Sequence, residues 1–302
     1  MNAGVVGVGY WGTKVLEEYA ALRDDGELDR VAAFDLDESR LEAATDADDA
    51  FTDIDSLLES VDAIHVCTNN QTHFDIAMAA MDRNVDVLVE KPLTTDRDRA
   101  FDLVERASES GQILQTGHVF RFANVVRTLR DLVDEGYFGE IQYYNVAWTH
   151  QIEPRDDGDV LWDLIVHPLD ILNFVSGAWP NVVGGTVGSF RRDDVNEVST
   201  IQLADETTRA NIQVSWVDPV RRRLFQVVGS ERSAVAACAA QEMTVYEDGE
   251  SFRYDVTPNN TIRTEAENFL DAIETRRNTF NSAIVGARIV DLIQEIHAEL
   301  DA

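Results

Sequence analysis

The stretch Val5-Val6-Gly7-Val8-Gly9-Tyr10-Trp11-Gly12 decides the fold expected of this chain. It ends a short apolar run that begins at Asn2, and apolar residues at helical spacing follow it. In such a strand, turn and helix, Gly7 permits the tight turn, Gly9 lets a pyrophosphate approach the backbone, and Gly12 lets helix and strand pack closely. The helix N-terminus offers amides and a partial positive charge to phosphates. The motif, with Tyr10 and Trp11 inside it, therefore predicts a dinucleotide site.

Asp35 supports this interpretation because it closes the second predicted strand, Val31 to Phe34, 23 residues after Gly12. A carboxylate in this position accepts hydrogen bonds from the adenosine ribose hydroxyls and repels a 2′-phosphate. The sequence thus predicts NAD as the cofactor, in preference to NADP. The competing interpretation is one more acidic residue on an acidic surface, and the place of Asp35 at a strand end favours binding.

Strands and helices alternate through the first third of the chain. Further strands are expected at residues 63–66, 85–89 and 112–116, with helices at 72–83 and 96–108. Such alternation is typical of a doubly wound parallel sheet with helices on both faces. Residues 1–120 are therefore expected to form a Rossmann domain.

After about residue 120 the pattern changes. A helix at 123–135, a strand at 141–149 and a helical segment at 161–175 precede a series of strands between 181 and 256. Their one-sided apolar alternation predicts a mainly antiparallel sheet with one open face. Helices at 263–276 and 282–300 close the chain and are expected to pack back. Residues 121–302 are thus predicted to be an α+β domain for substrate binding and oligomerisation.

The composition of the 302 residues restricts the class of protein. Formal net charge is −31, the isoelectric point is about 4.3, and 44% of residues are hydrophobic. Regular apolar periodicity argues against disorder as the reason for this acidity. An acidic chain that uses arginine rather than lysine is expected in a salt-rich cytoplasm, where the ions screen its self-repulsion. The same charge argues against nucleic-acid partners and anionic membranes.

The two cysteines, Cys67 and Cys238, lie far apart in apolar settings and suggest buried thiols rather than a disulfide or metal site. We therefore expect no metal. His65, His150 and His297 show no partner pattern and are expected to be structural. The sequence shows no signal peptide before the first predicted strand and no apolar run long enough to span a bilayer, so a cytoplasmic protein is expected.

Lys91 is one of only two lysines, against twenty-three arginines, and it lies in Glu90-Lys91-Pro92 directly after an apolar strand. A chain that has nearly abandoned lysine keeps one here, which suggests a task that a guanidinium cannot perform. An ammonium is a compact charge whose pKa responds to burial. The competing interpretation is an ordinary surface lysine.

A second group of polar residues lies in Leu161-Trp162-Asp163-Leu164-Ile165-Val166-His167-Pro168-Leu169-Asp170. Asp163 and His167 share a face if the segment is helical, and Pro168 suggests that the regular helix begins there. Histidine beside a carboxylate is suited to act as a general base near neutral pH. Without a neighbouring cofactor, an inert surface pair would be the better interpretation.

These residues together resemble the glucose–fructose oxidoreductase, inositol dehydrogenase and rhizopine-catabolism (Gfo/Idh/MocA) family. The resemblance rests on Gly7 to Gly12, Asp35, Glu90-Lys91-Pro92, Asp163 with His167 and Asp170, and Thr68-Asn69-Asn70-Gln71-Thr72-His73. It covers essentially the whole chain. Two shorter segments, 117–122 and 160–163, resemble members of the UDP-N-acetylglucosaminuronate 3-dehydrogenase type.

The resemblance implies an NAD-dependent oxidoreductase that removes hydride from a secondary alcohol of a sugar or nucleotide sugar. It implies that His167 takes the hydroxyl proton, that Lys91 hydrogen-bonds to the same oxygen, and that Asp163 orients the sugar or the lysine. Glu90 is expected near the nicotinamide ribose, with Thr68, Asn69 and His73 lining the cofactor cleft. For Asn69 the alternative is a residue that only finishes the strand.

The resemblance also implies substrate contacts and an oligomer. His118, Arg121 and Asn124 are the candidate substrate residues, and Arg121 is the preferred anion binder. Arg221-Arg222-Arg223 is expected to be a solvated strand entrance rather than an anion site. A homodimer or homotetramer is expected through the open sheet face. Three alternatives stay open: an inositol or free-aldose dehydrogenase, a non-catalytic NAD(H)-binding sugar sensor, and a family member that recycles its bound cofactor in place.

Overall fold

The computed structural model describes residues 1–155, 158–277 and 280–300. The chain divides into two compact units. The first consists of residues 1–118 and 261–290, and the second of residues 119–260 and the chain from Asp291 onward. The chain therefore leaves the first unit close to residue 120 and returns to it at Thr261, a route that a single boundary cannot describe.

The first unit contains a six-stranded sheet whose neighbouring strands are all parallel. Its spatial order is β3 (Asp49–Phe51), β2 (Arg30–Phe34), β1 (Asn2–Val6), β4 (Ala63–Val66), β5 (Asp86–Glu90) and β6 (Leu114–Gly117). This is the doubly wound order, in which the chain reverses direction of winding between β1 and β4. Ligands of such sheets bind at the carboxyl ends of the strands beside that reversal.

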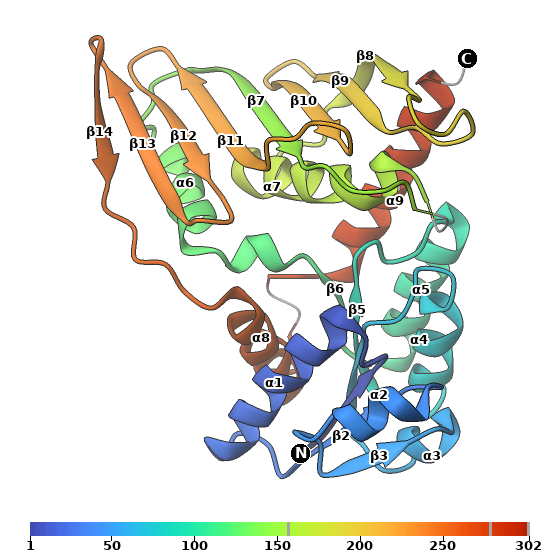
Figure 1. Cartoon of the computed structure of the whole chain (residues 1–302). Coiled ribbons are helices and arrows are strands. Elements are labelled where there is room, and N and C mark those ends of the chain that lie inside the picture. The colour runs from blue at the N-terminus through green and yellow to red at the C-terminus, as the bar shows by residue number, and fades with distance from the viewer. Residues whose placement is uncertain (156–157, 278–279, 301–302) are drawn as a thin grey trace. The chain divides into compact units, whose positions relative to one another are not determined.

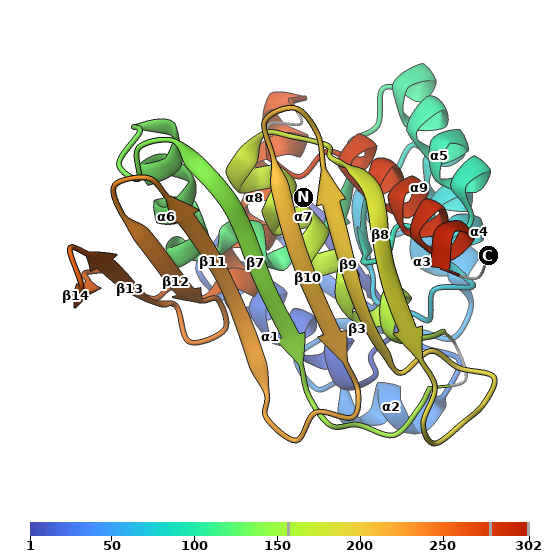
Figure 2. The ribbon, with the colours of Figure 1, turned by 90° about the horizontal axis from the view of Figure 1, so that it is seen from above.

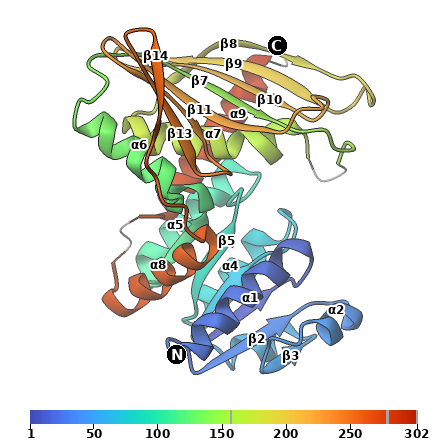
Figure 3. The same ribbon diagram turned by 60° about the vertical axis from the view of Figure 1, so that its left-hand side comes forward.

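Helices cover both faces of this sheet (Figure 1). One face carries α1 (Tyr10–Asp24) and α8 (Thr261–Thr275), whose apolar residues share a core with β1 and β2. The helices α4 (His73–Met81) and α5 (Arg97–Ser110) lie on the other side. Two short helices, α2 (Glu38–Ala43) and α3 (Ile54–Leu58), follow β2 and β3 (Figure 3). The predicted Rossmann architecture is confirmed.

The second unit is built on an eight-stranded sheet (Figure 2). Its order is β14 (Glu250–Tyr254), β13 (Glu242–Glu247), β12 (Ser233–Ala237), β11 (Arg222–Gly229), β7 (Ile141–Thr149), β10 (Arg209–Ser215), β9 (Val198–Ala204) and β8 (Asn181–Gly188). All neighbours are antiparallel except β7 and β10, which are parallel. The mainly antiparallel sheet predicted from the sequence is thus confirmed.

Helices lie on only one face of this sheet. They include α6 (Asn124–Asp134) and α7 (Val166–Ser176), which begin after the short helical segments Val119–Phe122 and Leu161–Ile165. The end of the C-terminal helix, at Leu300, approaches Gly185 of β8 from the same side. On β9 and β10 buried Ile201, Leu203 and Ile212 alternate with exposed Gln202 and Asn211. In the described residues no helix covers the exposed face (Figure 2), as the alternation predicts.

The segment before α7 differs in detail from the prediction. Residues Leu161–Ile165 form a π-helical turn, and α7 begins at Val166, so Pro168 is the third residue of the helix rather than its start. The backbone is helical on both sides of Ile165, so Pro168 lies inside a continuous helical run and contributes no amide to its hydrogen bonds. α9 (Ala283–Leu300) closes the described chain, and no helix in the described ranges is long and apolar enough to cross a membrane.

Candidate functional site

The glycine turn of the first unit has the geometry that its sequence predicts. Gly7 has a φ of +91°, a left-handed conformation that side chains resist. A Cβ atom on Gly12 would lie 1.8 Å from the carbonyl oxygen of Gly7, so only glycine allows this approach. At Gly9, by contrast, the nearest atom to a Cβ would be Arg40 Nη1 at 3.7 Å. The backbone is therefore closely packed where Gly12 meets Gly7, and it leaves space at Gly9, where a dinucleotide pyrophosphate fits.

Asp35 is held at the end of β2 by the backbone. Its Oδ2 accepts a hydrogen bond from the amide of Val8 at 3.0 Å, and its Oδ1 accepts one from the amide of Asp37 at 3.0 Å. The carboxylate, only 7% exposed, thus has a fixed orientation beside the glycine turn. Arg40 Nη1 lies 3.4 Å from Oδ2. Arg40 was not predicted from the sequence, although it lies five residues after Asp35 and is the third residue of the next helix.

The loop after β4 is tied to the Glu90-Lys91-Pro92 segment by His73. The fully buried imidazole places Nδ1 2.9 Å from the carbonyl oxygen of Pro92 and Nε2 3.1 Å from that of Thr68. Burial lowers the pKa of His73 despite both carbonyls, and a neutral ring donates to one of them. His73 therefore holds two loops together, whereas Asn69 is exposed.

Glu90 lies among polar groups that favour its charged form. Trp11 Nε1 donates to Glu90 Oε1, and the amide of Lys91 donates to Oε2 at 3.2 Å. Burial acts to raise the pKa of Glu90, but His65, Trp11 and Lys91 outweigh it and the pKa is lowered. The Trp11 indole of the glycine motif is thus hydrogen-bonded to a buried carboxylate at the end of β5. The neighbouring Tyr10 side chain, by contrast, is 83% exposed.

In the second unit, His167 lies within an aromatic group. Its ring centroid is 5.0 Å from that of Phe120 and 5.8 Å from that of Trp148. The ring is partly exposed and lies in the second residue of α7, just after the π-helical turn. These aromatic contacts restrict the rotation of the imidazole. A general base must be held in position in this way if it is to reach the proton that it accepts.

Asp163 contacts one side chain that is distant in the sequence, Trp216, and one that lies eight residues earlier, Arg155. Trp216 Nε1 donates to its Oδ2 at 2.9 Å, and Arg155 Nη1 lies 3.6 Å from its Oδ1. The carboxylate is therefore anchored by an indole N–H and faces a cation. Neither partner was predicted, because Trp216, which directly follows β10, and Arg155, which lies in a loop, meet Asp163 only in the folded unit.

Arg223 is a further residue that the sequence analysis undervalued. Its guanidinium lies 5.2 Å from the ring of Trp148, and its Nη2 donates to His150 Nδ1 at 2.6 Å. Burial, together with the charge of Arg221, lowers the pKa of Arg223 to about 10, against the opposite effect of Asp163. Arg223 is thus a half-buried cation in contact with an aromatic neighbour of His167, whereas Arg221 is exposed. The sequence predicted that all three arginines at 221–223 would be solvated, and of the three only Arg221 is exposed.

The three predicted substrate residues are more buried than expected. The guanidinium of Arg121 is paired with the carboxylate of Asp170 and donates from Nη2 to Asn173 Oδ1 at 2.9 Å. Arg121 is only 5% exposed, so its charge is neutralised within the unit, and the preferred anion binder is a structural residue. Asn124 donates its side-chain amide to the carbonyl of Thr257 at 2.9 Å, and His118 is 1% exposed.

The comparison with family profiles agrees with this geometry. The profile described as "Oxidoreductase family, NAD-binding Rossmann fold" matches residues 1–118. The profile of the GFO/IDH/MocA C-terminal domain matches residues 126–235. The chain belongs to the Gfo/Idh/MocA oxidoreductase family. The family resemblance and the NAD-binding fold predicted from the sequence are therefore confirmed.

Individual relatives include proteins that cover the whole chain. UDP-N-acetylglucosamine 3-dehydrogenase of Acidithiobacillus ferrooxidans is 28% identical over 319 aligned residues, spanning 100% of this chain and 98% of the relative. A solved structure of that enzyme matches with a TM-score of 0.87, over 100% of this chain and 98% of its own. Inositol 2-dehydrogenase of Mycolicibacterium smegmatis is 35% identical over 118 residues, which are 38% of this chain and 34% of the relative.

Proposed function

We propose that this oxidoreductase transfers hydride from a secondary alcohol of a nucleotide-linked sugar to NAD, at C3 of a UDP-N-acetyl amino sugar or its uronic acid. The observation that carries the proposal is Arg223, a half-buried cation beside the aromatic neighbour of His167. Its hydrogen-bond partners are two backbone carbonyls and an imidazole, all uncharged. A guanidinium that keeps its charge in such a place is suited to a phosphate or carboxylate. The full-length likeness to a UDP-N-acetylglucosamine 3-dehydrogenase supports the same substrate class.

The proposed roles follow from the chemistry of each side chain. His167, held by aromatic rings, accepts the proton of the reacting hydroxyl as the C–H bond breaks. Lys91 hydrogen-bonds to the same oxygen and stabilises the negative charge that develops on it. Asp163, anchored by Trp216, orients the sugar or the lysine. When bound, NAD supplies the hydride acceptor.

The cofactor is held by the first unit. The amides of the glycine turn and of the start of α1 receive the pyrophosphate, since Gly9 leaves space in front of them. The Asp35 carboxylate accepts hydrogen bonds from the hydroxyls of the adenosine ribose, and its negative charge repels a 2′-phosphate. Arg40, 3.4 Å away, is the residue that would weaken this discrimination. A kcat/KM for NAD at least tenfold above that for NADP is expected, and equal values would contradict the role of Asp35.

The open sheet face of the second unit is the proposed oligomer interface. The patch of this face over β7, β10, β9 and β8 exposes uncharged polar residues, with charged Arg209 toward its edge, in a chain whose residues are 27% charged. The polar residues of the patch are Asn145, Thr186, Thr200, Gln202, Asn211 and Gln213. A self-repelling acidic chain requires such a neutral surface if two copies are to meet. We propose a homodimer or homotetramer through this face, in a salt-rich cytoplasm. Sedimentation in molar KCl tests it, and a monomer at micromolar concentration would contradict it.

The substrate is tested by the appearance of NADH in molar KCl. The panel contains free aldoses, inositols, and UDP-linked amino sugars and uronates, with wild type and Lys91→Ala. Activity confined to UDP-linked compounds and lost in the variant is the expected result. Activity on free sugars would assign the chain to the inositol or aldose branch. Folded protein that binds NADH, lacks all turnover and is indifferent to Lys91→Ala would instead be a sensor, and NADH that copurifies would indicate a cofactor recycled in place.

A further inference from the structure

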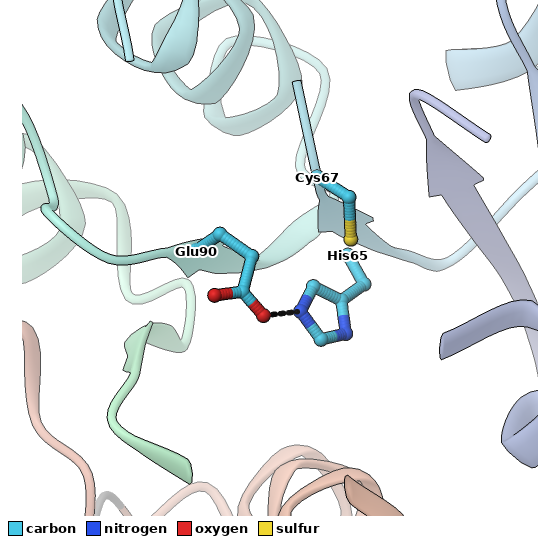
Figure 4. A group of neighbouring side chains, drawn as sticks. All are labelled: His65, Cys67 and Glu90. Atoms are coloured by element: carbon cyan, nitrogen blue, oxygen red, sulfur yellow. Dashed lines mark ion pairs between the residues drawn. The ribbon is translucent and has the colours of Figure 1, made fainter. Parts of the chain in front are cut away.

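His65, Cys67 and Glu90 form a cluster in which His65 and Glu90 are buried and Cys67 is partly buried, and the proposed reaction gives no role to His65 or Cys67. His65 lies in β4 and Cys67 directly follows that strand, where its amide still bonds to the carbonyl of Val6, so the two side chains point to one face of the sheet. Glu90 ends the neighbouring strand β5. One ligand atom from each residue lies within 4.8 Å of the other two. Figure 4 shows the imidazole and the carboxylate facing each other, with the sulfur pointing toward His65. All three residues belong to the first unit.

The polar atoms of this group are incompletely satisfied. His65 is 1% exposed, and neither ring nitrogen has a hydrogen-bond partner. Its Nε2 is 3.4 Å from Glu90 Oε1, longer than a normal hydrogen bond. The hydroxyl of Tyr19 is also buried without a hydrogen-bond partner, and its ring lies edge-on to His65 at 5.9 Å. Buried polar groups without partners are costly, which indicates that something further binds here.

The separation of His65 Nε2 and Glu90 Oε1 suits two ligands of a tetrahedral metal ion, and Cys67 Sγ lies within 4.8 Å of both atoms. Zinc binds nitrogen at about 2.0–2.1 Å and carboxylate oxygen at about 2.0–2.2 Å, so two such ligands in a tetrahedron lie about 3.3–3.5 Å apart. The observed separation of His65 Nε2 and Glu90 Oε1 is 3.4 Å. We propose that His65 Nε2, Cys67 Sγ and Glu90 Oε1 bind one Zn²⁺ ion, with the fourth position open to water.

The donor set and the charge both favour zinc. One nitrogen, one sulfur and one carboxylate oxygen are ligands of a borderline-soft ion, whereas magnesium and calcium prefer oxygen alone. On binding, the Cys67 thiol releases its proton to solvent as the sulfur–zinc bond forms. The thiolate and the Glu90 carboxylate then balance the two charges of the ion, and His65 stays neutral. This inference does not depend on which sugar the enzyme oxidises.

The test is a zinc titration of the intact, metal-free protein in molar KCl, in competition with a chromophoric chelator. Wild type is compared with Cys67→Ala and His65→Gln, and Cys238→Ala is the matched control because it removes the only other thiol. Wild type and Cys238→Ala are expected to bind one Zn²⁺ per chain. Both site variants, checked for native circular dichroism, are expected to bind at least 100-fold more weakly.

A second readout remains decisive even where a variant fails to fold. Co²⁺ bound to wild type and to Cys238→Ala is expected to give the near-ultraviolet absorption of a cobalt–thiolate bond. The proposal is overturned if wild type binds no zinc at micromolar concentration, if Cys67→Ala binds zinc as wild type does, or if the cobalt complex shows no thiolate absorption.

Discussion

The glycine turn of the first unit and the surroundings of His167 in the second are built in different ways. The turn depends on the backbone: Gly12 lies where a Cβ would reach the Gly7 carbonyl, and two amides orient Asp35. The His167 region depends on side chains, with Phe120 and Trp148 against the imidazole and Trp216 holding Asp163. The first arrangement is encoded within 35 consecutive residues. The second is assembled from helical segments, a strand and a loop that are distant in the sequence.

This difference predicts different tolerance to change. A substitution in the turn meets fixed backbone atoms, so it alters folding and cofactor binding together. A substitution beside His167 meets side chains that can move, so it alters catalysis or substrate affinity while the unit stays folded. Four variants measure this contrast, in order of decreasing effect.

Gly12→Ala is expected to have the largest effect, because its Cβ would lie 1.8 Å from a backbone oxygen. The loss of folding free energy should exceed about 4 kcal/mol, the range of severe backbone conflicts. Thermal unfolding in molar KCl measures it. Gly9→Ala is the matched control, since its Cβ would make only an ordinary van der Waals contact with the Arg40 side chain; it should fold normally and bind NADH at least tenfold more weakly. Normal folding of Gly12→Ala would contradict the backbone account of the turn.

His167→Asn is expected to lower kcat by about 10²- to 10⁴-fold, the contribution of a positioned general base. The dissociation constant of NADH, measured by fluorescence titration, should be unchanged because the cofactor residues lie in the first unit. A variant with kcat within threefold of wild type would remove His167 from the proposed reaction.

The contrast between the two halves also explains what the sequence could predict. The Rossmann order, Asp35 and the mainly antiparallel second sheet follow from local spacing and from alternation along single strands. Arg223 could not be assigned, because it lies beside Trp148 only through the pairing of β11 with β7, 75 residues apart. Arg121 was assigned wrongly for the same reason: its ion-pair partner Asp170 lies 49 residues away.

The His65, Cys67 and Glu90 group is an intermediate case. His65 and Cys67 are two residues apart at the end of an extended strand, so the sequence alone predicts that they lie on the same face. The third member depends on the register that pairs Val66 with Val89 and so carries Glu90 alongside Cys67. Searching for cysteine spacing alone could not find a site that draws one ligand from another strand.

Arg223→Met should affect substrate affinity more than turnover. The variant keeps the apolar stem beside Trp148 and removes the charge, so KM for a UDP-linked substrate should rise about 10- to 100-fold while kcat changes little. Steady-state kinetics in molar KCl measure both constants. Arg221→Met is the control, because the exposed guanidinium should contribute almost nothing. Equal effects of the two substitutions would contradict the distinct role of Arg223.

Glu197→Gln should have the smallest effect, and it should depend on pH. The buried carboxylate accepts hydrogen bonds from the amide of Phe190 at 2.7 Å and from Arg191 Nε at 2.6 Å. Burial opposes the charge, but these donors outweigh it and lower the pKa of Glu197 below its usual 4.5. An acid with a lowered pKa stabilises the fold above its unfolded pKa, and this stability is lost as pH falls toward the folded value.

The expected loss at pH 7 is about 1.5–3 kcal/mol, the contribution of hydrogen bonds to a charged group. The difference between wild type and Glu197→Gln should shrink below about pH 4.5, which chemical unfolding at pH 7 and pH 3.5 measures. Glu250→Gln, at an exposed position on β14, should show no such difference. A pH-independent difference for Glu197→Gln would refute the charged interaction.

The proposed oxidation is tested most directly by following the hydride itself. UDP-N-acetylglucosamine labelled with deuterium at C3 is incubated with the enzyme and NAD in molar KCl, and the NADH is analysed by mass spectrometry. The account predicts NADH that carries one deuterium, and almost none with His167→Asn. Unlabelled NADH, or folded enzyme that forms none from any UDP-linked sugar, would contradict it.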